Sequence, residues 1–313
     1  MPAAGYVLHG LRVTGVDRGD PVRAGRAIGL AVLAIPRARG ILRRAKADVV
    51  MGGGGYVAGP VGLAARTLGL PLVLTEADSH LGVANRLLAR FAVRVFLAFP
   101  IAGRDGEPYR VVGRPIPAGT GAADRAAARR RLGIGADERC LLVFGGSLGA
   151  RSINDAAVAA FGGSPPCAVL HVSGRRDHAS LERRLADLSF DPRYRLKAYV
   201  EPFADALAAA DLVVARSGGS VLEVAAAGLP SILVPYPHAT ADHQTANAHH
   251  MERAGAAIVI PDAELDARRL ADAVSCLLDD PERLAAMGRA ATATARPDAA
   301  GEVARELLAL AAR

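Results

Sequence analysis

Aromatic residues, cysteine and lysine are all scarce in this sequence. Its 313 residues include no Trp, 7 Phe, 6 Tyr and 3 Cys, and Lys46 and Lys197 are the two lysines among 38 basic residues. The scarcity of aromatic residues, and the absence of zinc-finger, RRM and basic-zipper patterns, argue against nucleic acid as a partner. The cysteines Cys140, Cys167 and Cys276 are far apart and odd in number, so we expect no disulfide framework and a reducing cytoplasm.

Long apolar runs are also absent. No run of about 18 apolar residues escapes interruption by Gly or Pro, and the start lacks the pattern of a signal peptide. We therefore expect a protein that touches a membrane without crossing it. Hydrophobic residues nevertheless make up 51% of the chain, which is typical of a globular protein, and the length favours two domains.

Basic residues are concentrated in the front third. Residues 1–120 hold 16 Lys and Arg against 7 Asp and Glu, whereas residues 121–313 hold 22 against 24. Such a surplus fits an anionic membrane surface or a phosphorylated substrate. The alternative is that Arg-rich helices only solvate one face.

Short β-rich runs alternate with alanine-rich stretches of helical period along most of the chain. This alternation predicts α/β domains in which helices cover both faces of a parallel sheet. Expected strands are 7–13, 48–51, 71–75, 93–98, 140–144, 168–172, 196–200, 212–215, 231–235 and 257–260, and expected helices include 24–45, 83–91, 124–132, 153–161, 204–210, 221–227, 242–253 and 265–278.

The alternation pauses between residues 110 and 128, in a stretch rich in Pro and Gly. We interpret it as a linker between a first domain over residues 1–115 and a second over 120–297, with a C-terminal helix over 298–313 that packs back on the first. The first domain opens on a loop, without the buried strand and glycine turn that begin a doubly wound domain. We therefore expect it to be short by one βα unit, either because the true start lies upstream of Met1, which we favour, or because the chain is truncated.

The strongest local signal is an apolar strand that runs into Gly145-Gly146-Ser147-Leu148-Gly149 and then a helix beginning near Arg151. Glycines let backbone N–H groups approach phosphate oxygens, and a helix N-terminus is positive. The pattern therefore predicts phosphate binding, although a tight turn alone would need the same glycines.

A second strand, turn and helix start runs from Arg216 to Glu223. Ser220 and Glu223 have the spacing of a capping box, which would explain both residues by helix stability alone. An acid just past a phosphate loop also accepts hydrogen bonds from ribose hydroxyls. Both interpretations remain open.

Four consecutive glycines, Gly52, Gly53, Gly54 and Gly55, follow a strand in the basic domain. Their cost in backbone entropy is understandable where the chain lies flat against a large or charged ligand, and a flexible loop is the alternative.

Polar residues also gather between Asp242 and Asn247 in the first turns of an expected helix. Asp242, His243, Gln244 and Asn247 would suit the hydroxyls of a sugar. A metal site is disfavoured, because neither an HExxH spacing nor a set of thiolates is present.

Taken in order, these segments resemble the MurG family. The matching stretches read GGGGYVAGP (52–60), GGSLGARSIN (145–154), RSGGSVLEVAAAGLP (216–230) and PHATADHQTANA (237–248). The resemblance implies a GT-B fold, in which two Rossmann-like doubly wound domains face a cleft. It implies an inverting transferase that moves N-acetylglucosamine from UDP onto undecaprenyl-diphospho-N-acetylmuramoyl pentapeptide in peptidoglycan synthesis, with no cofactor and no metal.

The resemblance also assigns site residues. It implies that the donor is bound by Asp78, Arg151, Ser173, Val200, Gly219, Ser220, Glu223 and Gln244, and the acceptor diphosphate by Gly52, Gly53, Gly54 and Gly55. It names no general base, because His9 and His80 match no family position. It further implies a peripheral protein on the cytoplasmic face of the cell membrane, whose partners are the lipid-linked acceptor, the anionic membrane surface and other cell-wall synthesis proteins.

The sequence departs from the family pattern at four places. An opening strand with its GGTGGH turn has no counterpart, Asp78 replaces an amide, the segment Arg216–Glu223 is one residue shorter, and Ala58 replaces a serine. Two alternatives follow: a related transferase with another lipid acceptor, and a catalytically inactive scaffold of the cell-wall machinery.

Overall fold

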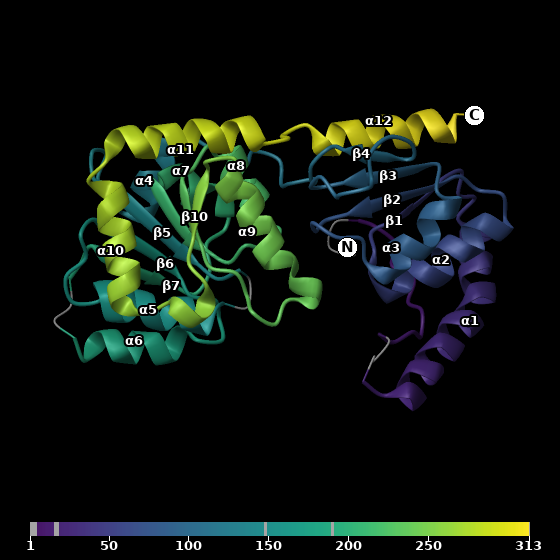
Figure 1. Cartoon of the computed structure of the whole chain (residues 1–313), viewed down its shortest axis with the longest axis horizontal. Helices are drawn as coiled ribbons and strands as arrows, with labels where there is room; N and C mark the ends of the chain where they lie inside the picture. The colour runs from purple at the N-terminus through teal and green to yellow at the C-terminus, as the bar shows by residue number, and fades with distance from the viewer. Residues whose placement is uncertain (1–4, 16–18, 147–148, 189–190, 313) are drawn as a thin grey trace. The chain divides into compact units, whose positions relative to one another are not determined.

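The chain folds into two compact units. The computed structural model describes residues 5–15, 19–146, 149–188 and 191–312 (Figure 1). Unit 1 comprises Met1–Arg114 and Asp298–Arg313, and unit 2 comprises Pro115–Pro297. Each unit has one parallel sheet with helices on both faces, so the predicted class of two parallel-sheet α/β domains is confirmed.

Unit 1 is built on a four-stranded sheet in the order β1-β2-β3-β4, with every pair parallel. Neighbouring residues in a strand point to opposite faces, so Leu72 and Leu74 enter one core while Val73 enters another. The elements of unit 1 are α1 (Pro21–Arg44), β1 (Val50–Gly52), α2 (Gly55–Thr67), β2 (Leu72–Glu76), α3 (Val83–Leu88), the 3₁₀ turn η2 (Ala89–Phe91), β3 (Arg94–Leu97), β4 (Tyr109–Val111) and α12 (Ala299–Ala311).

Helix α12 returns to unit 1 from the far end of the chain. Val303 and Leu310 pack with Phe96 against the face of the sheet opposite to α2 and α3. At the rim, Arg94 Nη2 lies 3.2 Å from Glu306 Oε1, and Arg110 forms an ion pair with Glu302. The last helix therefore completes the core of the first sheet.

The front of the chain differs from the sequence expectation. The predicted strand 7–13 is wrong, because residues 6–15 adopt no regular secondary structure and Tyr6, Val7 and Leu8 are highly exposed. Helix α1 begins three residues earlier than predicted because the Asp20 carboxylate accepts from the backbone N–H groups of Val22 and Arg23.

Unit 2 has a six-stranded parallel sheet in the order β10-β9-β8-β5-β6-β7. Strands β5 and β8 are continuous apolar runs, and β6 is apolar except for His171. All three are buried on both faces, as a doubly covered parallel sheet requires. Its elements are α4 (Arg125–Leu132), β5 (Cys140–Phe144), α5 (Arg151–Phe161), β6 (Ala168–Val172), α6 (His178–Ala186), β7 (Tyr194–Lys197), α7 (Phe203–Ala209), β8 (Leu212–Ala215), α8 (Val221–Ala226), β9 (Ser231–Leu233), η3 (Thr240–Asp242), α9 (His243–Arg253), β10 (Ala257–Val259), η4 (Asp262–Glu264), α10 (Ala267–Leu278) and α11 (Pro281–Thr294).

The two faces of this sheet have separate cores. Leu141 and Val143 pack on one face with α5, α6 and α10, whereas Leu142 and Phe144 pack on the other with α7 and α8. Most of the expected strands and helices of this unit are confirmed, and β5, β6 and β8 have the predicted bounds. Strand β7 lies two to three residues earlier than predicted, which leaves Val200 beyond its end.

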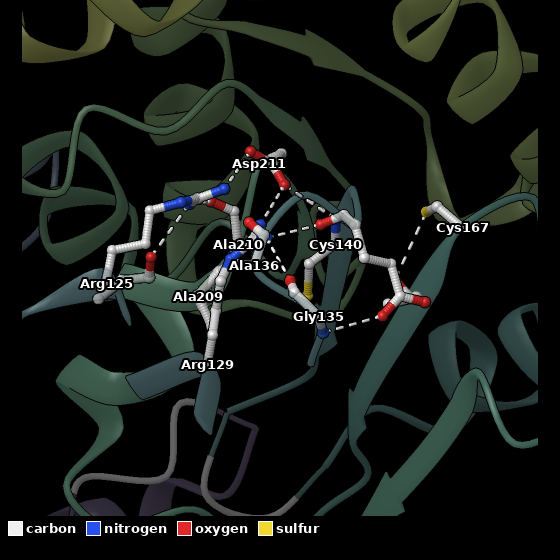
Figure 2. A network of polar contacts seen from close by, with 12 residues as sticks. Arg125, Arg129, Gly135, Ala136, Cys140, Cys167, Ala209, Ala210 and Asp211 are labelled. Atoms are coloured by element: carbon white, nitrogen blue, oxygen red, sulfur yellow. Dashed lines mark hydrogen bonds and ion pairs between the residues drawn. The ribbon is translucent and has the colours of Figure 1, made fainter. Parts of the chain in front are cut away.

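A buried arginine holds the amino ends of the central strands together. Arg129 of α4 is 3% exposed, and its guanidinium donates to the carbonyls of Gly135 and Ala136 and to Asp211 Oδ2 at 2.7–2.8 Å (Figure 2). The same carboxylate oxygen accepts from the backbone N–H of Cys140, the first residue of β5. This network therefore ties α4, β5 and the start of β8 together.

Candidate functional site

The order of the strands in unit 2 places a candidate site at the carboxyl end of β5. In the strand order, β6 and β7 follow β5 on one side, whereas β8, β9 and β10 follow it on the other side. The connections on the two sides of β5 and β8 therefore leave in opposite directions, and ligands of doubly wound sheets bind at such a switch point. The two glycine-rich turns found in the sequence follow these two strands.

The turn after β5 is shaped by glycine at three positions. A Cβ added at Gly145 would overlap Ala150, and one added at Gly149 would overlap the backbone oxygen of Ser173. Gly146 has φ +90°, and apart from its chain neighbours no atom of the described residues lies within 4 Å of the position that a Cβ would take there. Residues 147 and 148 of the predicted motif lie outside the described residues. Packing therefore explains Gly145 and Gly149, whereas the exposed Gly146 leaves backbone open to a ligand.

Helix α5 follows this turn directly. It has 11 residues, and no side chain caps its first N–H groups among the residues described around Ala150. Arg151 is its first residue and is exposed. A helix N-terminus beside an open glycine turn and an exposed arginine is an arrangement suited to a phosphate.

A network of buried hydrogen bonds holds the same turn in place. Asn154 of α5 donates through Nδ2 to the carbonyl of Ser173 (3.0 Å) and to Asp177, so its Oδ1 must accept, here from His171 Nε2 at 3.0 Å. His171 Nδ1 then accepts from the hydroxyl of Tyr194 at 2.7 Å. Burial lowers the pKa of His171 to about 3, so the imidazole is neutral near pH 7.

Ser173 lies where a direct ligand contact would need rearrangement. The side chain is fully buried, and its hydroxyl lies 3.3 Å from the carbonyl oxygens of Gly174 and Lys197 and from His178 Nδ1. Its backbone carbonyl is the group that meets Gly149. In this conformation Ser173 positions the turn instead of facing it.

Arg216 opens the second turn and is used internally. Its guanidinium donates to the carbonyls of Val234 and Pro235 (3.2 and 3.0 Å), to Asp262 Oδ1 (2.6 Å) and to Ser152 Oγ (2.7 Å). The side chain is only 11% exposed. Arg216 therefore joins the ends of β8 and β9, α5 and η4, although its place in a glycine-rich motif would equally fit a phosphate ligand.

At the start of α8, the described structure shows no capping hydrogen bond from Ser220. Ser220 is the residue before the helix, but its backbone is already helical. Gly219, Ser220 and Glu223 are all partly exposed at the carboxyl edge of the sheet. Ser220 therefore gives no support to a capping box, and the ribose interpretation of Glu223 remains a prediction.

Gln244 is held over the second turn. Its Oε1 accepts from the backbone N–H of Tyr236 at 3.0 Å. Its Nε2 lies 3.7 Å from the point where a Cβ would stand if Gly218 had a side chain. The backbone beneath is fixed because Ser217 Oγ donates to the Gln244 carbonyl and Asn247 Nδ2 donates to the Ser217 carbonyl. Asn247 is thus a buried structural residue, not a sugar contact.

Val200 contributes its side chain to a core. It is 8% exposed and packs in the same cluster as Phe144 and Val224. Only its backbone is therefore suited to address a ligand, as the resemblance implies for uracil.

In unit 1 the four glycines form a strand-turn-helix junction. Gly52 ends β1, Gly53 and Gly54 make the turn, and Gly55 begins the 13-residue helix α2. Gly54 and Gly55 have φ of +81° and +71°, and Gly53 and Gly55 are exposed. The predicted flat loop is therefore a tight turn that exposes backbone at a helix N-terminus.

The neighbouring loop, after β2, carries Asp78. The Glu76 carboxylate accepts from the backbone N–H groups of Ala77 and Gly82 and from Asn85 Nδ2, at 2.9–3.1 Å. Asp78 is partly exposed in this loop. Glu76 therefore organises the loop, and the sequence analysis did not assign it a role.

Several structural contributors were not predicted. Asn154, His171 and Glu76 act through buried or partly buried hydrogen bonds, which leave no signature in the sequence. Arg216 lies inside a predicted motif and Tyr236 lies just before one, and neither was assigned a role. Within the described ranges no three His, Cys, Asp or Glu side chains gather as a metal site.

Both units of the chain are similar to known glycosyltransferases. Residues 140–303 match the Glycosyltransferase family 28 C-terminal domain, and residues 2–97 match the Glycosyltransferase family 28 N-terminal domain. The chain is 42% identical over 313 residues to the UDP-N-acetylglucosamine--N-acetylmuramyl-(pentapeptide) pyrophosphoryl-undecaprenol N-acetylglucosamine transferase of Rubrobacter xylanophilus, covering 99% of this chain and 90% of the relative. The enzyme of the same name from Methylococcus capsulatus is 41% identical, with 98% and 86% covered.

The crystal structure of Acinetobacter baumannii MurG superimposes with a TM-score of 0.77 at 28% identity, covering 98% of this chain and 86% of that one. The chain belongs to the MurG family of glycosyltransferases. Membership confirms the resemblance and the GT-B fold inferred from four short motifs. The MurG-like motifs after β5, β8 and β9 lie together at one edge of the unit 2 sheet, and the fourth lies in unit 1.

Proposed function

We propose that this chain transfers N-acetylglucosamine from UDP-N-acetylglucosamine to undecaprenyl-diphospho-N-acetylmuramoyl pentapeptide. Relatives that carry this activity in their names are 36–42% identical over nearly the whole chain. The observation that carries the proposal is the open glycine turn at Gly146, which stands at the topological switch point and leads into α5.

In the proposed reaction, the 4-hydroxyl oxygen of the muramoyl sugar forms a bond to the anomeric carbon of N-acetylglucosamine. The bond from that carbon to the β-phosphate oxygen breaks, UDP departs, and the hydroxyl proton is released. The departing diphosphate gains negative charge, which backbone N–H groups near Gly146, the positive end of α5 and Arg151 are suited to stabilise. Glu223 would accept from the ribose hydroxyls, and Gln244 would donate to the sugar.

Unit 1 offers a second anion-binding feature for the acceptor. The turn of Gly53, Gly54 and Gly55 leads into α2. Gly54 and Gly55 have positive φ, a conformation that residues with side chains rarely adopt, and it exposes backbone N–H groups that can bind an anion. We assign the diphosphate of the lipid acceptor to this turn.

Helix α1 supports docking on an anionic membrane. Residues 21–44 include no Asp or Glu and six Arg, namely Arg23, Arg26, Arg37, Arg39, Arg43 and Arg44. One face packs through Ala27, Ala34 and Ala38, while Val32 and Leu33 are 58% and 75% exposed. No helix in the described part of the chain is long and apolar enough to cross a bilayer. An interfacial helix with arginines beside exposed aliphatic residues binds anionic lipid.

Vesicle sedimentation tests the membrane assignment. We expect the chain to sediment with vesicles containing phosphatidylglycerol and not with pure phosphatidylcholine, and to be released by salt because screening weakens the arginine contacts. Val32→Asp with Leu33→Asp should weaken binding at least tenfold, whereas Leu308→Asp, at an equally exposed site on α12, should not. Equal loss in both variants would refute a docking role for α1.

A transfer assay tests the main proposal. Purified chain is incubated with UDP-N-acetylglucosamine and either undecaprenyl-diphospho-N-acetylmuramoyl pentapeptide or a different undecaprenyl-diphosphate sugar. We expect a β-linked disaccharide product and UDP with the first acceptor only. Product with the second acceptor would favour a related transferase, and donor binding without any product would favour the inactive scaffold.

Glu223→Ala tests the donor assignment. It should weaken UDP binding because the ribose hydroxyls lose their acceptor, whereas Glu282→Ala, an exposed acid on α11, should not. Unchanged UDP affinity in Glu223→Ala would remove the ribose role.

A further inference from the structure

The loop after β9 presents an exposed aromatic ring that the proposed function does not use. Tyr236 is 43% exposed at the carboxyl edge of the unit 2 sheet. Only a few large apolar side chains among the described residues of this unit are so exposed, namely Leu188, Tyr199 and Tyr236. An aromatic ring left in water beside convergent polar groups is a common element of ligand sites.

The ring is held in place by Arg216. The guanidinium carbon lies over the Tyr236 ring, 5.4 Å from its centroid, while the same group donates to the carbonyls of Val234 and Pro235 just before it in the chain. Asp262 and Ser152 anchor the guanidinium in turn. Arg216 covers part of the ring, and Tyr236 nevertheless remains 43% exposed.

Tyr236 also determines which atom of the Gln244 amide can bind a ligand. Its backbone N–H occupies Gln244 Oε1 at 3.0 Å, so the amide reaches a ligand through Nε2, which only donates. The rings of His238 and Tyr236 form a T-shaped pair, with centroids 5.5 Å apart and an interplanar angle of 83°. An exposed aromatic ring thus belongs to the same residue whose backbone N–H fixes this donor.

We propose that Tyr236 is a further contact residue for the hexose of the donor. The exposed part of the ring packs against the C–H face of the pyranose, while Gln244 Nε2 donates to a hydroxyl or carbonyl oxygen at the rim of that sugar. A pyranose suits this site because it offers an apolar face and a polar rim, whereas a phosphate offers neither. The inference rests on the proposed function, since it specifies the sugar end of the same donor site.

Titration with UDP-N-acetylglucosamine and with UDP separates the sugar from the nucleotide. Tyr236→Ala should weaken UDP-N-acetylglucosamine about three- to tenfold, the range expected for loss of one aromatic contact, and leave UDP within twofold. Tyr236→Phe, which keeps the ring, should bind both ligands like the wild type, and Tyr236→Leu, which keeps apolar bulk without a flat ring, should behave like the alanine variant.

Tyr199→Ala is the matched control. Tyr199 is 49% exposed, also lies at the carboxyl edge of unit 2, and has Arg175 over its ring at 5.4 Å from the centroid. Any effect of Tyr199→Ala should change the two affinities by the same factor, because the residue is not assigned to the sugar.

Three outcomes would overturn the inference. These are wild-type affinity for UDP-N-acetylglucosamine in Tyr236→Ala, an equal loss of both ligands in that variant, and full retention by Tyr236→Leu. If the wild type bound neither UDP nor UDP-N-acetylglucosamine, the proposed function itself would fail and this inference with it. Unfolding midpoints measured without ligand identify any variant whose loss reflects folding.

Discussion

At the scale of single residues, the turn after β5 has one glycine that is tightly packed and another, three positions earlier, that is exposed. Gly149 has φ +78° and lies against the Ser173 carbonyl, whereas Gly146 has φ +90° and open space beside it. The two positions share a left-handed backbone and differ only in what surrounds them. Comparing them therefore separates the packing role of a glycine from its conformational role.

We expect Gly149→Ala to destabilise the protein more than Gly146→Ala. The left-handed backbone alone costs an alanine about 1–2 kcal/mol, and at Gly149 the overlap with Ser173 adds to it. Urea unfolding measures both free energies. Equal destabilisation by the two substitutions would mean that the close approach at Gly149 relaxes without cost.

Residue burial also predicts a pH dependence. The pKa of His171 is lowered from its usual 6.5 to about 3 by burial, so below pH 6.5 the unfolded chain binds a proton that the folded chain does not. Stability is therefore lost as pH falls from 6.5 toward 3, by about 1.4 kcal/mol for each pH unit. Urea unfolding at pH 7, 5.5 and 4.5 measures this slope.

His171→Gln should reduce that slope by about one proton, because it removes the buried titrating group. His249→Gln is the control, since His249 is on the surface beside Glu252. An unchanged slope in His171→Gln would show that another group governs the acid response.

At the scale of elements, the Arg129 network explains why α4 is attached so firmly to the sheet. One guanidinium satisfies carbonyls of the loop before β5 and the Asp211 carboxylate before β8 (Figure 2). The network lies at the amino ends of the strands, whereas the candidate site lies at their carboxyl ends. Substitutions in this network should therefore lower the stability of the protein without changing its affinity for the ligand.

We expect Arg129→Met to cost about 1–3 kcal/mol, because the carbonyls of the loop before β5 lose their donor, while Asp211 keeps Arg125 and the Cys140 N–H. UDP affinity measured well below the unfolding temperature should stay within twofold. Arg130→Met, at the exposed next position on α4, serves as the control. A large loss of UDP affinity in Arg129→Met alone would show that the network reaches the site.

At the scale of the whole molecule, unit 1 is formed by two segments from opposite ends of the chain. Its first 114 residues build the sheet, and α12 adds Val303 and Leu310 to the face that carries Phe96. The core of unit 1 therefore depends on residues that follow the whole of unit 2 in the sequence.

Deletion of residues 298–313 should destabilise unit 1 and leave UDP binding by unit 2 intact. Each buried Val or Leu removed costs roughly 2 kcal/mol, and the ion pair between Glu306 and Arg94 is lost as well. Proteolysis followed by peptide mapping measures the accessibility of unit 1, and Leu308→Ser on the exposed side of α12 is the control. Protection of unit 1 in the truncated chain would refute a structural role for α12.

The sequence by itself determined the class of fold, the central strands of unit 2 and the family. Strand runs such as Cys140–Phe144 are apolar throughout because both faces of that sheet are covered, and this local pattern survives any arrangement of the rest. Glycine turns at strand ends and the charge of the front third are likewise local properties.

Only the tertiary structure decided how polar side chains are used. Arg216 is one of many arginines in the chain, and nothing near it in sequence says that its partners are Ser152 and Asp262 rather than a phosphate. Ser173 matched a binding motif and proved to be buried, while Tyr236 matched none and proved to be exposed. Burial and long-range hydrogen bonds depend on which elements pack together, and that is settled only when the sheet and its helices assemble.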